Sequence, residues 1–284
     1  MLLRNLRDQI AEQLHEQYER REAVNIANLI LQELTGVVPA DFGWRHATDV
    51  SLRQPPVSEF VKRLRKGEPV QHLLGKVYFD DLVLNVSSDV LIPRPETEEL
   101  VYHIRKKYEK RPKPVHVLDV GTGSGCIILS LAKAGIGTHF WAWEKSEAAL
   151  AIAQKNAQDH GLDIHWIHDD FLRPQKKNVL PAFDLVVSNP PYIPEQERPR
   201  LARQVRDFEP ESALFVPGNR PILFYEHLAR WAQSGGMTRG GRLFVELHPD
   251  YAQQTETCWV QAGLQKCFIK KDLQGKWRYL EALR

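Results

Sequence analysis

The alternation of strands and helices in the second half of the chain most strongly limits the folds that it can adopt. Short, largely apolar runs predict strands at residues 115–120, 140–144, 164–168, 185–188 and 243–247, with further β-like runs near Cys267 and Tyr279. Predicted helices begin at Cys126 and cover residues 146–160 and 222–233. Near-continuous apolar strands separated by helices are typical of a parallel sheet that is covered on both faces. Residues 93–284 are therefore predicted to form an α/β domain.

The N-terminal part of the chain carries helical patterning only. Apolar residues recur at helical spacing in residues 3–14 and 27–34, and Gly36 ends the second run. A third helix is predicted over residues 60–64, with Gly67 as its C-terminal cap. These elements predict a small helical domain over residues 1–76.

A β-hairpin is predicted between the two domains. Residues 77–79 and 82–84 are short β-type runs, and Asp80 and Asp81 separate them. We assign residues 77–92 to this hairpin and the link that follows it.

The composition excludes several classes of protein. Hydrophobic residues make up 43% and charged residues 26% of the 284 residues, as in an ordinary soluble globular protein. A formal net charge of +2 gives no overall attraction to nucleic acid. Three cysteines, Cys126, Cys258 and Cys267, form no CxxC pattern and suit a reducing compartment. Because neither a secretion signal nor an apolar run of membrane-spanning length is present, we expect a cytoplasmic protein that binds no membrane.

A glycine-rich loop follows the first strand of the α/β domain. Its residues are Gly121, Thr122, Gly123, Ser124 and Gly125. Ligands bind at this turn in open α/β sheets, and glycines let the backbone approach a ligand closely. Alone, such a loop is equally consistent with a tight turn. Its GxGxG spacing lacks the third glycine of a dinucleotide-binding loop, so it points away from NAD.

Polar and aromatic residues end the next two strands. Glu144 ends the second strand, where a carboxylate can accept hydrogen bonds from both hydroxyls of a ribose. Asp170 and Phe171 follow the third strand and offer an acceptor and an aromatic face to an adenine ring. Either carboxylate alone is equally consistent with a solvated strand end. Three successive strand ends with this chemistry predict a nucleoside-containing cofactor.

The fourth strand leads into Asn189, Pro190, Pro191 and Tyr192, the most informative stretch of the chain. The Asn189 side-chain oxygen and the Pro190 carbonyl can each accept one N–H of a planar, weakly nucleophilic nitrogen. The nitrogen is then held with its lone pair aimed at the bound cofactor, and a methyl group carried by that cofactor could be transferred to it. The prolines fix φ and contribute no competing N–H, and Tyr192 can stack on the planar acceptor. An isolated Asn-Pro is usually a turn after a buried strand, but its place after a glycine-loop fold favours a methyl-transfer site.

Several stretches from about Gly67 to the C-terminus resemble the release factor glutamine methyltransferase family. They are Gly-Glu-Pro-Val-Gln-His-Leu-Leu-Gly at 67–75, Leu-Ile-Pro-Arg-Pro-Glu-Thr-Glu at 91–98, the glycine loop, the Asn-Pro-Pro-Tyr tetrapeptide, and Phe-Glu-Pro at 208–210. DNA adenine methyltransferases share the tetrapeptide, so it defines only the type of acceptor. The segment at residues 93–97 is much more specific to the family.

The resemblance implies a Rossmann-like class I S-adenosylmethionine-dependent methyltransferase. It would methylate the glutamine amide in the Gly-Gly-Gln motif of peptide chain release factors, release S-adenosylhomocysteine and need no metal. With Asp170 from the argument above, the residues expected to bind the methyl donor are Gly121, Thr122, Gly123, Ser124, Gly125, Glu144, Asp170, Phe171 and Asn189. The residues expected to hold the glutamine are Asn189, Pro190, Pro191 and Tyr192, and those expected to be catalytic are Asn189, Pro190 and Tyr192. The helical domain would help to grip the release factor, and we expect a monomer.

Some positions depart from the family pattern. Glu144 stands where Asp is common and Phe171 where Trp is common, and both changes keep the chemistry. Residues 216–221 lack the usual Asp-Gly, and His248-Pro249 replaces a glycine-containing turn. These two differences leave the loops on the substrate side open.

Other interpretations compete with this one. Adenine methylation of DNA or RNA is the rival activity, although no extra recognition domain or strongly basic surface is evident. A non-catalytic adaptor is the other alternative, and the intact tetrapeptide counts against it. Stable nucleic-acid binding is not expected, because the basic run around residues 105–113 is more typical of a solvated helix end. Arg94 and Glu96 suit either support of the pocket or an ion pair at the domain junction.

A metal site at two histidines is not expected. His165 and His168 precede Asp169 and Asp170, which gives a group of residue types that bind metals. Residues three apart on a strand point to opposite faces, so the two histidines cannot readily share an ion.

Overall fold

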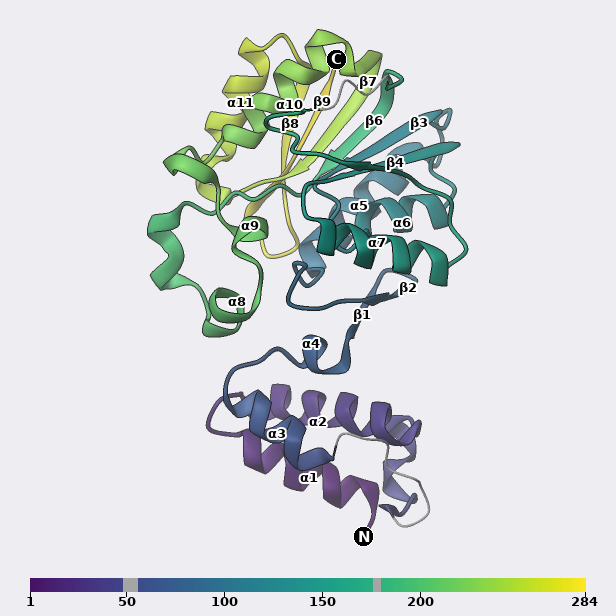
Figure 1. Ribbon diagram of the computed structural model, residues 1–284, viewed down its shortest axis with the longest axis vertical. Coiled ribbons are helices and arrows are strands. Elements are labelled where there is room, and N and C mark those ends of the chain that lie inside the picture. The colour runs from purple at the N-terminus through teal and green to yellow at the C-terminus, as the bar shows by residue number, and fades with distance from the viewer. Residues whose placement is uncertain (48–55, 176–179) are drawn as a thin grey trace. The chain divides into compact units, whose positions relative to one another are not determined.

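The computed structural model describes residues 1–47, 56–175 and 180–284 and divides into two compact units (Figure 1). The first unit contains Met1–Lys76 and Ala202–Phe208, and the second contains Val77–Leu201 and Glu209–Arg284. The hairpin thus belongs to the larger unit, and a short segment from the second half of the chain belongs to the helical one. The proposed domain boundaries at residues 76 and 92 stay a prediction.

The helical unit is built around one apolar core. Its helices are α1 (Leu3–Leu14), α2 (Arg20–Thr35), α3 (Val57–Arg65), α4 (Val70–Leu74) and α8 (Arg203–Phe208), with a 3₁₀ turn at Pro39–Gly43. The three helices predicted from apolar spacing are confirmed, because their periodic residues form the buried cluster. Its members include Leu3, Ile10, Leu14, Ile30, Leu31, Phe42, Phe60 and Leu64.

Glycines end two of these helices as predicted. Gly36 follows α2 with a φ of 71°, and its N–H donates to the carbonyl of Gln32 at 2.8 Å. Gly67 has a φ of 92° and lies two residues beyond Arg65, the last position of α3. Its N–H and that of Glu68 donate to the carbonyls of Leu64 and Arg63, which forms a Schellman motif.

We expect Gly36→Ala to lower the free energy of unfolding of the helical unit by about 1 kcal/mol, because an L-residue with a side chain is strained at positive φ. Gly43→Ala is the matched control. Both glycines have open space where a Cβ would lie, but only Gly36 has a positive φ. Urea unfolding followed by circular dichroism measures both losses, and equal losses would contradict the backbone explanation.

The larger unit contains a seven-stranded sheet in the order β5-β4-β3-β6-β7-β9-β8. The strands are β3 (His116–Val120), β4 (His139–Glu144), β5 (His165–His168), β6 (Phe183–Ser188), β7 (Met237–Glu246), β8 (Gln265–Lys271) and β9 (Trp277–Leu283). The first five strands in this order pair in parallel, but β9 is antiparallel to both of its neighbours. The prediction of a parallel sheet is therefore wrong at β9. The turn between β8 and β9 is too short for the crossover that parallel pairing requires.

Helices cover both faces of the sheet, as predicted (Figure 1). One face packs against α5 (Pro95–Tyr108), α6 (Cys126–Lys133) and α7 (Glu147–Asp159), and the other against α10 (Leu223–Trp231) and α11 (Ala252–Gln261). Val117 and Leu118, neighbours on β3, belong to opposite clusters, as the alternation of a strand requires. The short elements are α9 (Glu211–Leu214), 3₁₀ turns at Glu195–Arg200, Pro217–Asn219 and Pro249–Tyr251, and a π turn at Ala232–Gly236.

The predicted hairpin is present as β1 (Lys76–Phe79) and β2 (Leu82–Asn85). The Asp80 carboxylate in its turn accepts hydrogen bonds from Arg105 of α5 at 2.6 and 2.7 Å and from Ser130 of α6 at 3.0 Å. The neighbouring Lys106 and Lys107 pair with Glu109 and Glu281. The start of the basic run is thus engaged in ion pairs within its own unit.

None of the helices within the described residues combines the length and the apolar character that a membrane span requires.

Candidate active site

A cavity of about 390 Å³ opens at the carboxyl ends of the parallel strands. Parallel strands end at the same edge of a sheet, so segments far apart in the chain meet there. The predicted site residues that line the cavity are Gly121, Thr122, Gly123, Ser124, Glu144, Asp170, Phe171, Asn189, Pro190 and Pro191. Gly125 and Tyr192 lie outside this lining. The structure therefore brings most of the predicted site together, while the role of each residue stays a prediction.

The glycine loop needs glycine for two different reasons. Gly121, Gly123 and Gly125 have φ values of 75°, 56° and 83°, which side chains disfavour. A Cβ on Gly125 would also lie 3.0 Å from Leu129 and 3.4 Å from Ala153. Gly125 therefore permits the close packing of α6, whereas Gly121 and Gly123 face the cavity.

Two buried residues flank this loop. Asp119 is the second-last residue of β3, and the Thr122 hydroxyl donates to its carboxylate at 2.7 Å. Burial nevertheless raises the pKa of Asp119 to about 7. Cys126, the first residue of α6, is buried as well, and burial raises the pKa of its thiol to about 12, so the thiol stays protonated.

Backbone N–H groups hold the Glu144 carboxylate against the loop. One oxygen accepts from Gly123 at 2.9 Å, and the other accepts from Lys145 at 2.8 Å and Ser146 at 2.9 Å. This hydrogen bonding fixes the direction of an acidic side chain that lines the cavity. Asp170 follows the next strand and pairs with Lys145 at 2.9 Å.

Phe171 presents a buried aromatic ring to the same cavity. Its ring packs edge-on against Trp143 and Trp231, with centroids 5.2 and 5.6 Å apart. Only 9% of the residue is exposed. The ring is therefore held in place by other aromatic side chains.

Asn156 is a supporting residue that sequence reasoning missed. It lies on α7, is fully buried, and its Nδ2 donates to the Ser124 carbonyl at 2.8 Å. Its Oδ1 accepts from the backbone N–H of Asn85 in β2 at 2.7 Å. Asn156 thus ties the glycine loop to the hairpin. The sequence offered one indication of this role, because Asn156 lies on the same face of the helix as Ala149 and Ala153, where an apolar residue is expected.

A hydrogen-bond network surrounds the tetrapeptide. Asn189 Nδ2 donates to Thr97 Oγ1 at 3.0 Å, and Thr97 Oγ1 donates to Glu246 Oε2 at 2.7 Å. Tyr192 Oη donates to the other oxygen of Glu246 at 3.0 Å. Glu246 is 1% exposed, and burial raises its pKa. Thr97 and Glu246 were not predicted as site residues, although Thr97 lies in the specific segment at residues 93–97.

Unlike the three residues before it, Tyr192 does not line the cavity. Its hydroxyl is bonded to Glu246, and its ring packs edge-on against His248 at 5.9 Å. Burial and the charge of Glu246 raise the pKa of Tyr192, so its hydroxyl stays protonated as a donor. Stacking of Tyr192 on a substrate stays a prediction.

Arg94 pairs with Glu209 and so connects two of the motif segments. Glu209 is buried and also accepts a hydrogen bond from the Ile92 N–H at 3.3 Å. Burial raises the pKa of Glu209, and the charge of Arg94 opposes this effect. Arg94 thus forms an ion pair with the Phe-Glu-Pro segment at residues 208–210, while support of the pocket by Arg94 and Glu96 stays a prediction.

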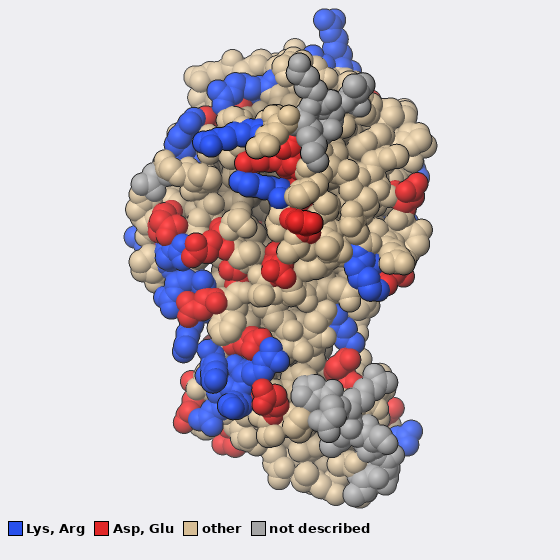
Figure 2. Space-filling model, in the orientation of Figure 1, with Lys and Arg blue, Asp and Glu red and all other residues tan. Residues whose placement is uncertain are grey.

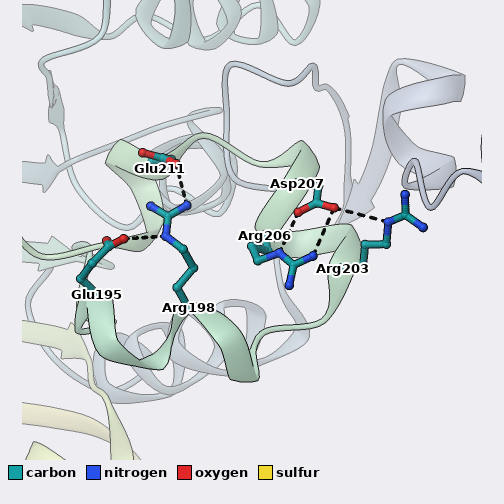
Figure 3. A network of polar contacts seen from close by, with 6 residues as sticks. All are labelled: Glu195, Arg198, Arg203, Arg206, Asp207 and Glu211. Carbon is teal, nitrogen blue, oxygen red and sulfur yellow. Dashed lines mark hydrogen bonds and ion pairs between the residues drawn. The ribbon is translucent and has the colours of Figure 1, made fainter.

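Arg198 braces the segment that follows the tetrapeptide (Figure 3). It contacts Glu195 at 2.5 Å and Glu211 at 2.6 Å. Its guanidinium lies 4.2 Å from the ring centroid of Phe215, which lines the cavity.

A second ionic cluster in Figure 3 lies on α8, where Asp207 contacts Arg206 at 2.7 Å and Arg203 at 3.4 Å. Exposed pairs of this kind contribute little stability.

The two histidines of β5 make separate contacts. His165 stacks on Trp141 at 4.6 Å, and a ring nitrogen of His168 lies 3.1 Å from the Lys145 carbonyl oxygen. In the part of the chain that the structure describes, no three His, Cys, Asp or Glu side chains converge as a metal site would require.

Comparisons with known proteins agree with this architecture. Residues 96–207 match the model of the methyltransferase small domain family. Release factor glutamine methyltransferases of Flavobacterium psychrophilum and Bacteroides thetaiotaomicron are 32% and 34% identical to the chain. The first match covers 99% of this chain and 99% of the relative, and the second covers 97% of this chain and 98% of the relative.

A solved structure shares the fold. The Thermus thermophilus 16S rRNA N2 G1207 methyltransferase, in complex with AdoMet and guanosine, has a TM-score of 0.54 at 18% identity. The match covers 74% of this chain and 49% of that one.

The fold and the cavity define a Rossmann-like class I methyltransferase. Within this class, similarity over nearly the whole chain identifies the family. The chain belongs to the release factor glutamine methyltransferase family.

Proposed function

We propose that this protein transfers the methyl group of S-adenosylmethionine to the glutamine side-chain amide in the Gly-Gly-Gln motif of peptide chain release factors. The names of its relatives support this substrate. The observation that carries the proposal is that residues 121–124 of the glycine loop, Glu144 and Asn189-Pro190 line one cavity. S-adenosylhomocysteine is the second product.

The cavity suits this cofactor in size and chemistry. Its volume of about 390 Å³ lies within the usual range for small-molecule sites. We assign the ribose hydroxyls to the Glu144 carboxylate and the adenine ring to Phe171, with Asp170 as an acceptor beside it. The backbone of Gly121 to Ser124 lines the same cavity. When bound, the cofactor supplies an electrophilic methyl group on a positively charged sulfur.

The tetrapeptide supplies two acceptors for the substrate nitrogen. Asn189 Nδ2 is bonded to Thr97, and no donor among the described residues reaches Asn189 Oδ1. We assign one substrate N–H to this oxygen and the other to the Pro190 carbonyl. Holding both hydrogens orients the nitrogen lone pair, which lowers the barrier mainly through positioning. The methyl carbon bonds to the nitrogen as its bond to sulfur breaks, the bonding electrons stay on the sulfur of S-adenosylhomocysteine, and the nitrogen releases one N–H proton to solvent.

The partner and compartment complete the proposal. Release factors act on ribosomes, so we place the activity in the cytoplasm, without a stable complex with nucleic acid and without a metal. On the face shown in Figure 2, acidic side chains lie among the basic ones. Among the described residues of either unit on that face, the basic side chains form no continuous stripe of the kind typical of phosphate-backbone binding. A substrate-gripping role for the helical unit and a monomeric state stay predictions.

The proposal is tested by incubating the purified protein with methyl-labelled donor and a bacterial release factor. We expect the Gly-Gly-Gln glutamine to gain one methyl group, located by tandem mass spectrometry. A release factor with Gln→Ala in this motif is the control, and it should stay unlabelled. Labelling of DNA or RNA oligonucleotides instead would replace this proposal by the rival activity.

A further inference from the structure

A buried carboxylate links the tetrapeptide to two distant elements. Glu246, the last residue of β7, accepts hydrogen bonds from Thr97 in the first turn of α5 and from Tyr192. Thr97 and Glu246 are 2% and 1% exposed. Asn189 is the next member of the chain of hydrogen bonds, because its Nδ2 lies 3.0 Å from Thr97 Oγ1. Neither Thr97 nor Glu246 has a role in the function proposed above.

The direction of these hydrogen bonds follows from the donors available. Thr97 and Tyr192 each donate their hydroxyl hydrogen to one oxygen of Glu246, at 2.7 and 3.0 Å. Thr97 has a single hydroxyl hydrogen, which leaves its oxygen only as an acceptor toward Asn189. The Asn189 amide must therefore turn its NH₂ group to Thr97. The reversed amide would place two acceptors face to face with no hydrogen between them.

We propose that Thr97 and Glu246 are positioning residues that orient the Asn189 side-chain amide, so that its oxygen and not its nitrogen is presented to the acceptor substrate. This inference rests on the proposed function, because it requires Asn189 Oδ1 to accept the substrate N–H. Both residues act through Asn189 and not on the reacting atoms. Tyr192 shares the same carboxylate, so Glu246 holds both ends of the tetrapeptide.

The surroundings of Glu246 act on its pKa in opposite directions. Burial raises the pKa, and the charge of Glu96 adds to this effect, whereas the hydroxyls of Thr97 and Tyr192 and the positive charge of Arg278 lower it. Arg278 is itself paired with Asp272 at 3.1 Å. The two hydroxyl donors and the cation thus replace part of the stabilisation that water gives to an exposed carboxylate.

The first test compares Thr97→Val with Thr97→Ser. Valine keeps the branched shape but removes the hydroxyl, so the Asn189 amide loses its partner and its defined orientation. We expect Thr97→Val to lower kcat for release factor methylation about tenfold, with the Kd for S-adenosylhomocysteine unchanged. Thr97→Ser restores the hydroxyl and should stay within about twofold of the wild type. Wild-type kcat in Thr97→Val would overturn the proposal.

A matched control separates orientation from stability. Thr255 of α11 is also fully buried, and its hydroxyl donates to the Tyr251 carbonyl at 2.9 Å, but it does not line the cavity. Thr255→Val should therefore leave kcat unchanged. An equal fall of kcat in Thr255→Val and Thr97→Val would assign the effect to the loss of any buried hydroxyl and overturn the proposal.

Glu246→Gln provides a second, independent variant. The glutamine presents one donor and one acceptor where the carboxylate has two acceptors, so the donor direction at Thr97 is no longer unique. We expect a fall in kcat with unchanged donor affinity. Glu281→Gln, at another buried carboxylate that does not line the cavity, is the control and should keep its kcat. Unchanged kcat in Glu246→Gln would contradict the inference.

The orientation can also be read without turnover. The Asn189 side-chain NH₂ gives a pair of NMR signals, which are assigned by their absence in Asn189→Asp. These signals should shift in Thr97→Val and stay in place in Thr97→Ser; unmoved signals in Thr97→Val would overturn the proposal. If the wild-type protein methylates no release factor, the proposed function fails, but this measurement still reports whether Thr97 orients the amide.

Discussion

Replacing Asn189 by alanine is expected to lower the rate of methyl transfer about 10²- to 10³-fold, because one of the two acceptors that orient the substrate nitrogen is lost. Donor affinity should change little, since the glycine loop, Glu144 and Phe171 remain. Single-turnover rates with a release factor measure the first quantity, and calorimetry with S-adenosylhomocysteine measures the second.

The control for this variant removes an amide elsewhere. Gln158 is exposed on α7 and does not line the cavity, so Gln158→Ala should keep the wild-type rate. A rate within twofold of the wild type in Asn189→Ala would remove Asn189 from the catalytic assignment. A parallel loss of donor affinity and rate would instead make it chiefly a donor-binding residue.

The second large effect is expected at Glu144. Glu144→Ala removes the proposed acceptor of both ribose hydroxyls, and hydrogen bonds to a charged group contribute about 1.5–3 kcal/mol each. It also frees the N–H groups of Gly123, Lys145 and Ser146 that the carboxylate now accepts. We therefore expect the Kd for S-adenosylhomocysteine to rise about 10²-fold in calorimetric titrations.

Two further variants make this test specific. Glu144→Asp keeps the carboxylate that the family commonly carries, and it should bind the cofactor within about tenfold of the wild type. Glu147→Ala removes an exposed carboxylate three positions after Glu144, in the first turn of α7, and should leave binding unchanged. Tight binding by Glu144→Ala would refute the ribose assignment.

Much of the α/β unit could be predicted because its signals are local. The central strands β3 and β6 and the second half of β7 are largely apolar, and the buried residues of a central strand need no partner to be recognised in the sequence. Helix α5 was predicted only at its C-terminal end, from the basic run, although Pro95 begins it and Leu100, Val101 and Ile104 follow at helical spacing. Considered without the helix that follows, the prolines at 93 and 95 indicate a loop.

Polar residues on buried faces were the main omission at the site. Asn156 and Thr97 carry side chains that are usually exposed, so sequence alone does not distinguish them from solvent-facing residues. Their importance follows from hydrogen-bond partners that are distant in the sequence. Thr97 and Glu246 are 149 positions apart in the chain, and Asn156 is 71 positions from Asn85.

The strand–helix alternation, the glycine loop and the place of the Asn-Pro-Pro-Tyr tetrapeptide after a buried strand could be recognised in the amino-acid sequence. These features depend on neighbouring residues, through side-chain periodicity and backbone restrictions on glycine and proline. The direction of β9, the membership of residues 202–208 in the helical unit, and the orientation of Asn189 through Thr97 and Glu246 became evident from the folded chain alone. Sheet pairing and side-chain hydrogen bonds join positions far apart in the chain, and they have no local pattern from which they can be recognised.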